Sequence, residues 1–120
     1  MQQELRIAFR NMDVSEALER RIRTRVSELE QICDRITACD VVVELIHRKP
    51  QPGKLFHVRL DLALPGRTIV VKRDPDGQHA HEDAHAAVRD AFNVARQQLA
   101  DHVRVMRGNV KAHAQSTMAE

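Results

Sequence analysis

The sequence has very few aromatic residues: three Phe, and no Trp or Tyr, among 120 residues. The hydrophobic core must therefore be built from Val, Ile, Leu and Ala. We also expect no platform of exposed rings for stacking single-stranded bases, which counts against RRM-like or OB-type recognition. Cysteine is equally scarce. Cys33 and Cys39 form neither a disulfide framework nor a C-x-x-C motif, so we expect small core or helix-end residues.

Long apolar runs are also missing. No run approaches the ~20 residues of a membrane span, and the N-terminal segment lacks the apolar stretch of a signal peptide. These absences predict a cytoplasmic protein with no membrane partner. The formal net charge of +2 does not demand a polyanionic partner, although a balanced total can hide a basic face. The apolar fraction is 42%. This fraction and the length suit one domain that folds without disulfides or a structural metal.

The first third of the chain shows two different periodicities. Apolar residues alternate with polar ones over residues 5–9, which predicts a half-buried strand. Apolar residues then recur every three or four positions over residues 15–36, which predicts one long helix. Its start has two possible signals, because Asp13 with Glu16 could form a capping box or Ser15 could be the N-cap.

The rest of the chain predicts three strands and a second helix. Alternating apolar residues indicate strands over residues 41–45, 56–62 and 68–72, separated by Pro- and Gly-containing breaks. The helical period returns from about residue 81 to 106, and we expect Gly108 to stop the helix. Residues 109–120 are small and polar, which predicts a flexible tail.

Together these elements predict an α+β fold in the order β-α-β-β-β-α. Short turns join the later three strands, so they should pair as an antiparallel meander. A right-handed crossover would place the first strand parallel to its neighbour. The apolar faces are best buried in two layers, with a four-stranded sheet and both helices on one face. We assign residues 1–108 to this single domain and residues 109–120 to the tail.

Basic residues gather on the predicted helices. Arginines displace counterions from phosphates and bind them in bidentate geometry, so a basic face would suit nucleic acid. The alternative is a solvated helix surface whose charges pair at i,i+4, such as Glu16–Arg20 and Glu19–Arg23. The candidate contact residues on or beside the two helices are Arg21, Arg25, Arg35, Arg89, Arg96, Arg104 and Arg107.

A histidine cluster is the second candidate site. His81 and His85 are four residues apart and can share one helix face, and His79 could add a third metal ligand. The simpler alternative is a polar helix N-terminus, in which Glu82 and Asp83 suit the helix dipole. We expect no bound metal and no cofactor.

Catalytic motifs are absent from the sequence. There is no P-loop, no G-x-G-x-x-G and no recognised nucleophile motif. His57, Arg59 and Asp61 share the outer face of one predicted strand, which is most simply a solvated charge pattern. We therefore expect a binding protein, not an enzyme, and no small-molecule substrate.

Several short motifs resemble one family. The residues Ser15-Glu16-Ala17-Leu18, Arg25, Leu29-Glu30-Gln31 and Asp34-Arg35-Ile36 are similar to the first helix of the ribosome hibernation-promoting factors. That family is also called ribosome-associated translation inhibitors or sigma-54 modulation proteins. Asp83, Ala86, Ala87 and Val88 match its D-x-Y-A-A-I-D signature, followed by Leu99. The resemblance covers Leu5 to about Arg107, with His85 and Arg89 departing from the signature.

The resemblance implies a fold related to the double-stranded RNA-binding domain and a short form of the family. It implies binding to the small ribosomal subunit and its rRNA, where the protein would block the mRNA and tRNA channel during stress or stationary phase. The seven arginines would then contact rRNA, with Arg25 at a basic position of the family. Asp101, Val103 and Val105 interrupt the lysine-rich run with which the family's second helix usually ends.

A second function class remains open. Val42, Ile46 and Val70 are predicted to face outward from the sheet and would make its open face apolar. Exposed apolar patches of this kind often mark interfaces. The alternative prediction is therefore a protein-interaction module or homodimer that does not bind ribosomes.

Overall fold

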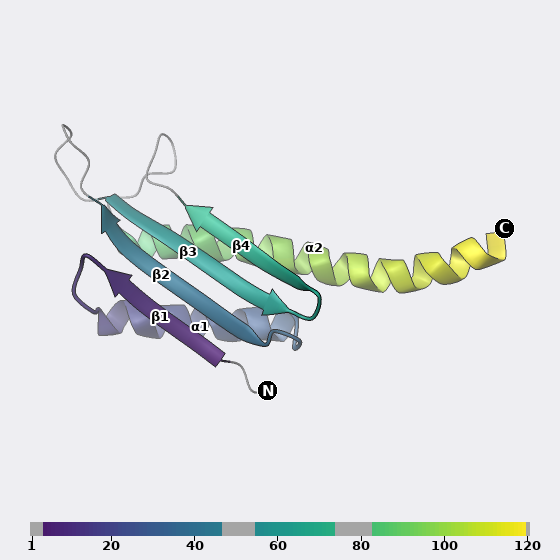
Figure 1. Ribbon diagram of the computed structural model, residues 1–120, viewed down its shortest axis with the longest axis horizontal. Helices are drawn as coiled ribbons and strands as arrows, with labels where there is room; N and C mark the ends of the chain where they lie inside the picture. The colour runs from purple at the N-terminus through teal and green to yellow at the C-terminus, as the bar shows by residue number, and fades with distance from the viewer. Residues whose placement is uncertain (1–3, 47–54, 74–82, 120) are drawn as a thin grey trace.

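The computed structural model describes residues 4–46, 55–73 and 83–119. Its elements follow the predicted order β-α-β-β-β-α, and each predicted strand lies within an observed one (Figure 1). The elements are β1 (Glu4–Arg10), α1 (Glu16–Ile32), β2 (Ala38–Ile46), β3 (Leu55–Leu64), β4 (Arg67–Arg73) and α2 (Ala84–Ala119).

The four strands form one sheet in the order β1-β2-β3-β4. β1 pairs with β2 in parallel, and β2, β3 and β4 pair antiparallel, as the crossover and meander rules predict. The pairing aligns Ile7, Val41, Leu60 and Val71 in one row across the sheet. Because side chains alternate along each strand, this register places the apolar set on one face.

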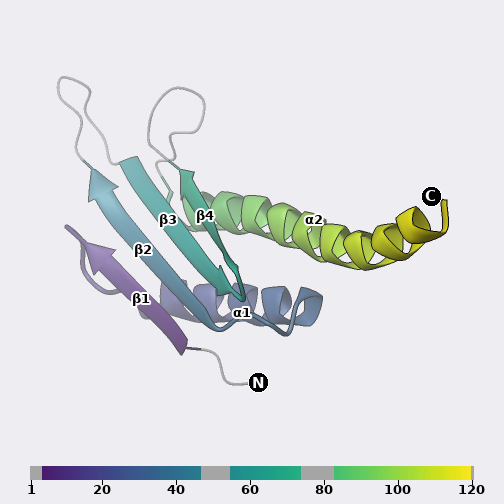
Figure 2. The same cartoon turned by 45° about the vertical axis from the view of Figure 1, so that its right-hand side comes forward.

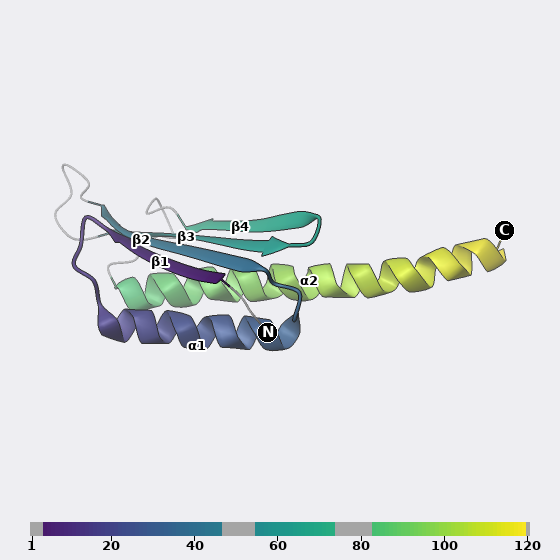
Figure 3. The ribbon, with the colours of Figure 1, turned by 60° about the horizontal axis from the view of Figure 1, so that its bottom comes forward.

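Both helices cover that apolar face (Figure 3). They lie side by side, begin at the same end of the molecule and run in the same direction (Figures 2 and 3). The core between the layers is aliphatic, as the scarcity of aromatics predicts, with Phe92 its one fully buried ring among the described residues. Leu18, Ile22, Leu60 and Leu99 are among the side chains that it buries completely.

The ends of α1 are set by two hydrogen bonds. Ser15 is the N-cap, because its Oγ accepts from the Leu18 N–H at 3.2 Å, and such a bond satisfies a donor that the helix itself leaves free. At the other end the Cys33 N–H donates to the Leu29 carbonyl at 3.0 Å, and the backbone then becomes extended. The prediction that this helix continues to residue 36 is wrong. Ile36 is buried, but it reaches the core from the connection between α1 and β2.

α2 is longer than predicted. Asp83 caps its start by accepting from the His85 N–H at 2.9 Å, and the helix runs through Gly108 to Ala119, beyond the edge of the sheet (Figure 1). The prediction of a stop at Gly108 is wrong. A glycine stop needs a positive φ, which among the described glycines only Gly66 has. A helical Gly costs only about 1 kcal/mol. The separation of residues 109–120 from the domain stays a prediction.

The two cysteines take the predicted places. Cys33 lies half-buried at the end of α1, and Cys39 is buried in the core on β2. Burial, with a smaller contribution from Asp40 and Asp61, raises the pKa of the Cys39 thiol to about 12, because an apolar environment disfavours the thiolate. The Cys39 thiol therefore stays protonated at neutral pH. Within the described ranges, neither helix has the length and apolarity that crossing a membrane requires.

Candidate nucleic-acid interface

One flank of α1 faces α2. Arg21, Arg25, Glu28 and Ile32 follow at spacings of four, three and four residues, so they lie in one stripe of the helix. Ile32 lines a hollow together with residues of α2, which fixes the direction of the stripe. The stripe therefore presents two arginines and one glutamate toward the second helix.

Arg25 is the most enclosed of these arginines. Its side chain is only 25% exposed, and its Nη1 donates to Glu28 Oε1 at 3.3 Å. Its Nε is buried and has no hydrogen-bond partner among the described residues. An unsatisfied buried donor on a cation costs free energy, so an anionic or polar ligand that reached this atom would be favoured.

The facing flank of α2 contains no acidic residue. Its stripe follows at spacings of three and four and consists of His85, Arg89, Asn93, Arg96, Ala100, Val103 and Arg107. Three members of this stripe (Ala100, Val103 and Arg107) line the hollow beside Ile32, so the stripe faces α1. We call this line between the helices the helix seam and define it by Arg21, Arg25, Arg89, Arg96 and Arg107.

The charges of the helix seam are mostly unneutralised. Among the residues that the structure describes, Arg21, Arg89, Arg96 and Arg107 form no ion pair with a carboxylate, and Glu28 is the single acidic residue between them. Arginines without carboxylate partners can bind phosphates and release their counterions, so a basic stripe of this kind suits a nucleic-acid backbone.

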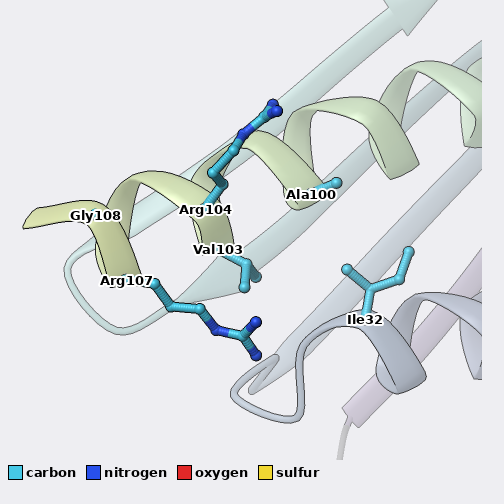
Figure 4. A pocket seen from close by; sticks show the side chains of 6 residues that line it. All are labelled: Ile32, Ala100, Val103, Arg104, Arg107 and Gly108. Atoms are coloured by element: carbon cyan, nitrogen blue, oxygen red, sulfur yellow. The ribbon is translucent and has the colours of Figure 1, made fainter. Parts of the chain in front are cut away.

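Two predicted residues are not members of the helix seam, although each lines one of the two hollows between the ends of the helices. Arg104 is on α2, but it pairs with Asp101 on the same helix, and Figure 4 shows its side chain pointing away from Ile32. Arg35 lies in the turn after α1 and is exposed. The structure thus brings five of the seven predicted arginines into one line and places Arg35 at the end of that line.

The helix seam ends in two adjoining hollows. The first lies between Ile32 and the last described side chains of α2, where Val103 and Ile32 point toward each other (Figure 4). The second, of about 640 Å³, shares Ile32, Val103 and Arg107 with the first and is completed by Cys33, Asp34, Arg35, Leu64, Pro65, His102 and Met106. We call the second hollow the groove. The sequence did not indicate it, because it forms only where α1, α2 and the β3–β4 turn meet.

The opposite, open face of the sheet has a different charge pattern. Arg59 donates to Asp61 from Nε at 3.1 Å and from Nη2 at 3.4 Å, and this bond raises the pKa of the Arg59 guanidinium. Arg6 Nη2 lies 3.1 Å from Glu4 Oε2, and Arg6 Nε lies 3.9 Å from Asp40 Oδ1. The predicted solvated charge pattern on this face is confirmed for Arg59 and Asp61, and Arg6 likewise has carboxylate partners on the same face.

The outward apolar residues do not form a continuous patch. The sheet register places Val42 opposite Arg59, and it places Val70 opposite Asp61. Ile46 lies opposite Leu55 at the far end of the sheet. Val70 is 42% exposed, whereas Val42 and Ile46 are half-buried. The charges that separate them weaken the case for an apolar interface on this face.

The histidine candidates can be described only in part. His79 and His81 lie outside the described residues, whereas His85 is exposed on the first turn of α2. In the described ranges no three His, Cys, Asp or Glu side chains are grouped so that they could hold a metal ion. The metal site therefore remains untested as a hypothesis.

Comparison with known proteins gives the family. No curated protein sequence matches the chain. Among solved structures, the fold is similar to the N-terminal domain of Protein Y from Thermus thermophilus, with a TM-score of 0.65, 18% identity, and coverage of 81% of this chain and 94% of the other. It is also similar to a ribosomal subunit interface protein from Coxiella burnetii, with a TM-score of 0.68, 17% identity, and coverage of 84% and 98%.

Because the sequence identities are low, these structural likenesses establish the fold alone. The family model described as sigma 54 modulation protein / S30EA ribosomal protein matches residues 5–107, which is nearly the whole described domain. The match begins in β1 and ends at Arg107, so it includes all five arginines of the helix seam. The chain belongs to the sigma 54 modulation protein / S30EA ribosomal protein family.

Proposed function

We propose that the protein binds the small ribosomal subunit through its helix seam and blocks the mRNA and tRNA channel during stress or stationary phase. The unneutralised arginines of the helix seam carry this proposal, because phosphate contacts by basic side chains supply most of the affinity for RNA. The family supports it, and so does the structural likeness to the ribosomal subunit interface protein from Coxiella burnetii. The protein would act in the cytoplasm, where ribosomes are.

The proposed mechanism is steric and involves no covalent chemistry. A two-layer domain with a closely packed core keeps its shape when it binds. Arg21 and Arg25 on α1 and Arg89 and Arg96 on α2 would hold rRNA phosphates, while Arg35, Arg104 and Arg107 would extend the contact toward the end of the helices. Bound in this way, the domain occupies space that mRNA or tRNA needs.

Co-sedimentation with purified small subunits through sucrose gradients tests binding. We expect the protein to migrate with subunits at low salt and to be released as salt rises, since counterions compete for the phosphates. The double variant Arg89→Gln/Arg96→Gln should reduce the slope of log affinity against log salt by about 2, or about 1 for each lost phosphate contact.

A matched control removes two charges from the open sheet face. Arg10→Gln/Lys72→Gln has the same net charge as the α2 variant, but its substitutions lie on the outer side of β1 and β4. It should sediment like the unmodified protein. Absence of binding at low salt would exclude the proposal, and equal losses in the two variants would show that net charge, not the helix seam, determines affinity.

Competition with the natural ligands tests the blocking step. If the protein and the natural ligands require the same space, small subunits loaded with mRNA and initiator tRNA should bind the protein at least about tenfold more weakly than empty subunits. Equal binding to loaded and empty subunits would leave ribosome binding intact and refute the blocking mechanism.

A further inference from the structure

The groove at the end of the helix seam has an apolar wall. Ile32 from α1, Leu64 from the end of β3, and Val103 and Met106 from α2 all line it. Met106 is 52% exposed, although it is a large apolar side chain. The groove has a volume of about 640 Å³. This volume falls within the size range of small-ligand sites, which are mostly apolar with a few polar groups.

Polar and charged groups stand around this wall. Arg35 and Arg107 supply two guanidinium groups, and Asp34 supplies one carboxylate. Neither arginine forms an ion pair among the described residues, and Arg107 extends from α2 toward the chain that follows α1 (Figure 4). The rim therefore favours an anion, and Asp34 can accept a hydrogen bond from a neutral donor.

His102 adds a hydrogen-bond donor. Its Nδ1 lies 3.4 Å from Arg67 Nη1, and a guanidinium can only donate. Neutral His102 must therefore accept at Nδ1 and carry its proton on Nε2. The groove thus combines an apolar wall, two cations, one donor and one acceptor.

The groove continues the helix seam. Val103 lies in the same stripe of α2 as Arg89 and Arg96, and Arg107 belongs both to the helix seam and to the groove. An RNA strand whose phosphates follow the helix seam would therefore bring its next nucleotide to the groove. A base within a continuous duplex could not enter, whereas an unstacked base could.

We propose that the groove holds one unstacked nucleotide of the bound RNA. Its base would lie against Val103 and Met106, and its phosphate would contact Arg35 and Arg107. Asp34 and the His102 Nε2–H would face the polar edge of the base. This proposal rests on the proposed function and specifies which feature of rRNA the protein recognises, without requiring an aromatic platform.

The test uses hairpin RNAs that differ at one bulged position. One set has each of the four nucleotides in turn as a single bulge, and the reference has an abasic residue at the same place, so that the phosphates are equal. Fluorescence anisotropy should show about tenfold tighter binding for at least one base-containing bulge than for the abasic RNA. That preference should persist at raised salt, because a burial contact releases no counterions.

Variants of the apolar wall test whether the preference for a base-containing bulge depends on the groove. Val103→Ser/Met106→Ser should abolish it and leave the affinity for abasic RNA unchanged, because no charge is removed. The single variant Met106→Ser, at a half-exposed position that the fold tolerates, should reduce it by about threefold or more. Val105→Ser is the matched control, since Val105 is 54% exposed on α2 and does not line the groove.

Two results would overturn the proposal. Equal affinity for the abasic and all four bulged RNAs would show that no base is recognised, and a preference unchanged in both wall variants would place the base elsewhere. Either result together with normal co-sedimentation would refute the groove alone. If the unmodified protein bound neither the small subunit nor any of the hairpin RNAs, the proposed function would be refuted as well.

Discussion

The helix side and the open sheet side of this domain both carry arginines, but they differ in where the carboxylates lie. On the sheet, Arg6 and Arg59 each have an acidic partner on the same face. Along the helix seam, Arg89 and Arg96 have none among the described residues. The comparison shows that a near-neutral chain can still present one phosphate-binding face, because paired charges on one side do not neutralise the other.

The largest expected effect concerns the two faces of the sheet itself. Leu60 is fully buried in the centre of the inner face, whereas Val70 on the outer face is already partly in water. Leu60→Ala should lower the free energy of unfolding by about 2–5 kcal/mol, because it leaves a cavity. Val70→Ala should lower it by less than about 1 kcal/mol. Urea unfolding at two protein concentrations measures both.

The same measurement tests the homodimer alternative. If a second copy covered the open face, stability would rise with protein concentration. Val70→Ala would then cost as much as a core truncation at high concentration, and the contrast between the two faces of the sheet would fail.

The second prediction concerns alkaline stability. The unfolded Cys39 thiol titrates near 9.0, whereas the folded thiol has a pKa of about 12. Between these values the unfolded state binds fewer protons than the folded state. Stability should therefore be unaffected below about pH 9 and should fall as pH rises, by about 1.4 kcal/mol at about pH 10 and about 4 kcal/mol at about pH 12. Urea midpoints across this range measure the loss.

Two substitutions, one on each face of β2, test whether Cys39 causes the alkaline loss of stability. Cys39→Val should flatten the alkaline part of the stability profile, whatever its effect at neutral pH. Asp40→Asn, which removes a carboxylate from the outer face beside Cys39, should reduce the alkaline loss. An unchanged profile in Cys39→Val would show that another group causes the alkaline unfolding.

The third prediction compares two arginines on α1. Arg21→Glu should weaken small-subunit binding about tenfold, or about 1.4 kcal/mol, because Arg21 lies on the helix seam. Arg23→Glu should weaken it less than about threefold, because Arg23 is on another flank and already pairs with Glu19 at 3.2 Å. Both variants change the charge equally. Similar losses would mean that the RNA contacts α1 more broadly than the helix seam.

The smallest effect concerns the length of α2. A Cβ added at Gly108 meets nothing within 4 Å, whereas Gly66 has a φ of +76°. Gly108→Ala should raise helix content and stabilise α2 by up to about 1 kcal/mol, because its helical backbone suits alanine. Gly66→Ala should destabilise the fold by about 1–2 kcal/mol, because its backbone is left-handed. Circular dichroism and urea unfolding separate these outcomes. A loss of helix in Gly108→Ala would restore the predicted stop.

Much of the fold could be predicted from the sequence, since periodicity identified every strand and both helices. It failed where an apolar residue kept the helical spacing outside a helix. Ile36 follows Ile32 at four residues, but it reaches the core from a connection, and spacing alone cannot show this. Gly108 is the converse case, because a residue that often ends helices continues one when its φ stays negative.

The candidate site was predicted as residues but not as a shape. Helical spacing placed Arg89 and Arg96 on one face of α2, but it could not orient that face toward Arg21 and Arg25 of α1. That orientation depends on tertiary packing. Leu64 and His102 were not predicted at all, because neither carries a motif and they meet only through the β3–β4 turn.

β1 gives the domain a weak point. It is bonded to the sheet along one edge only, and its inward side chains Leu5, Ile7 and Phe9 remain half-buried, whereas those of β2 and β3 are mostly buried. Its partner β2 follows only after the whole of α1. Local opening therefore costs least here, and β1 amides should exchange with deuterium faster than those of β2 and β3. Opening of β1 would leave β2 as a new sheet edge, able to accept another strand.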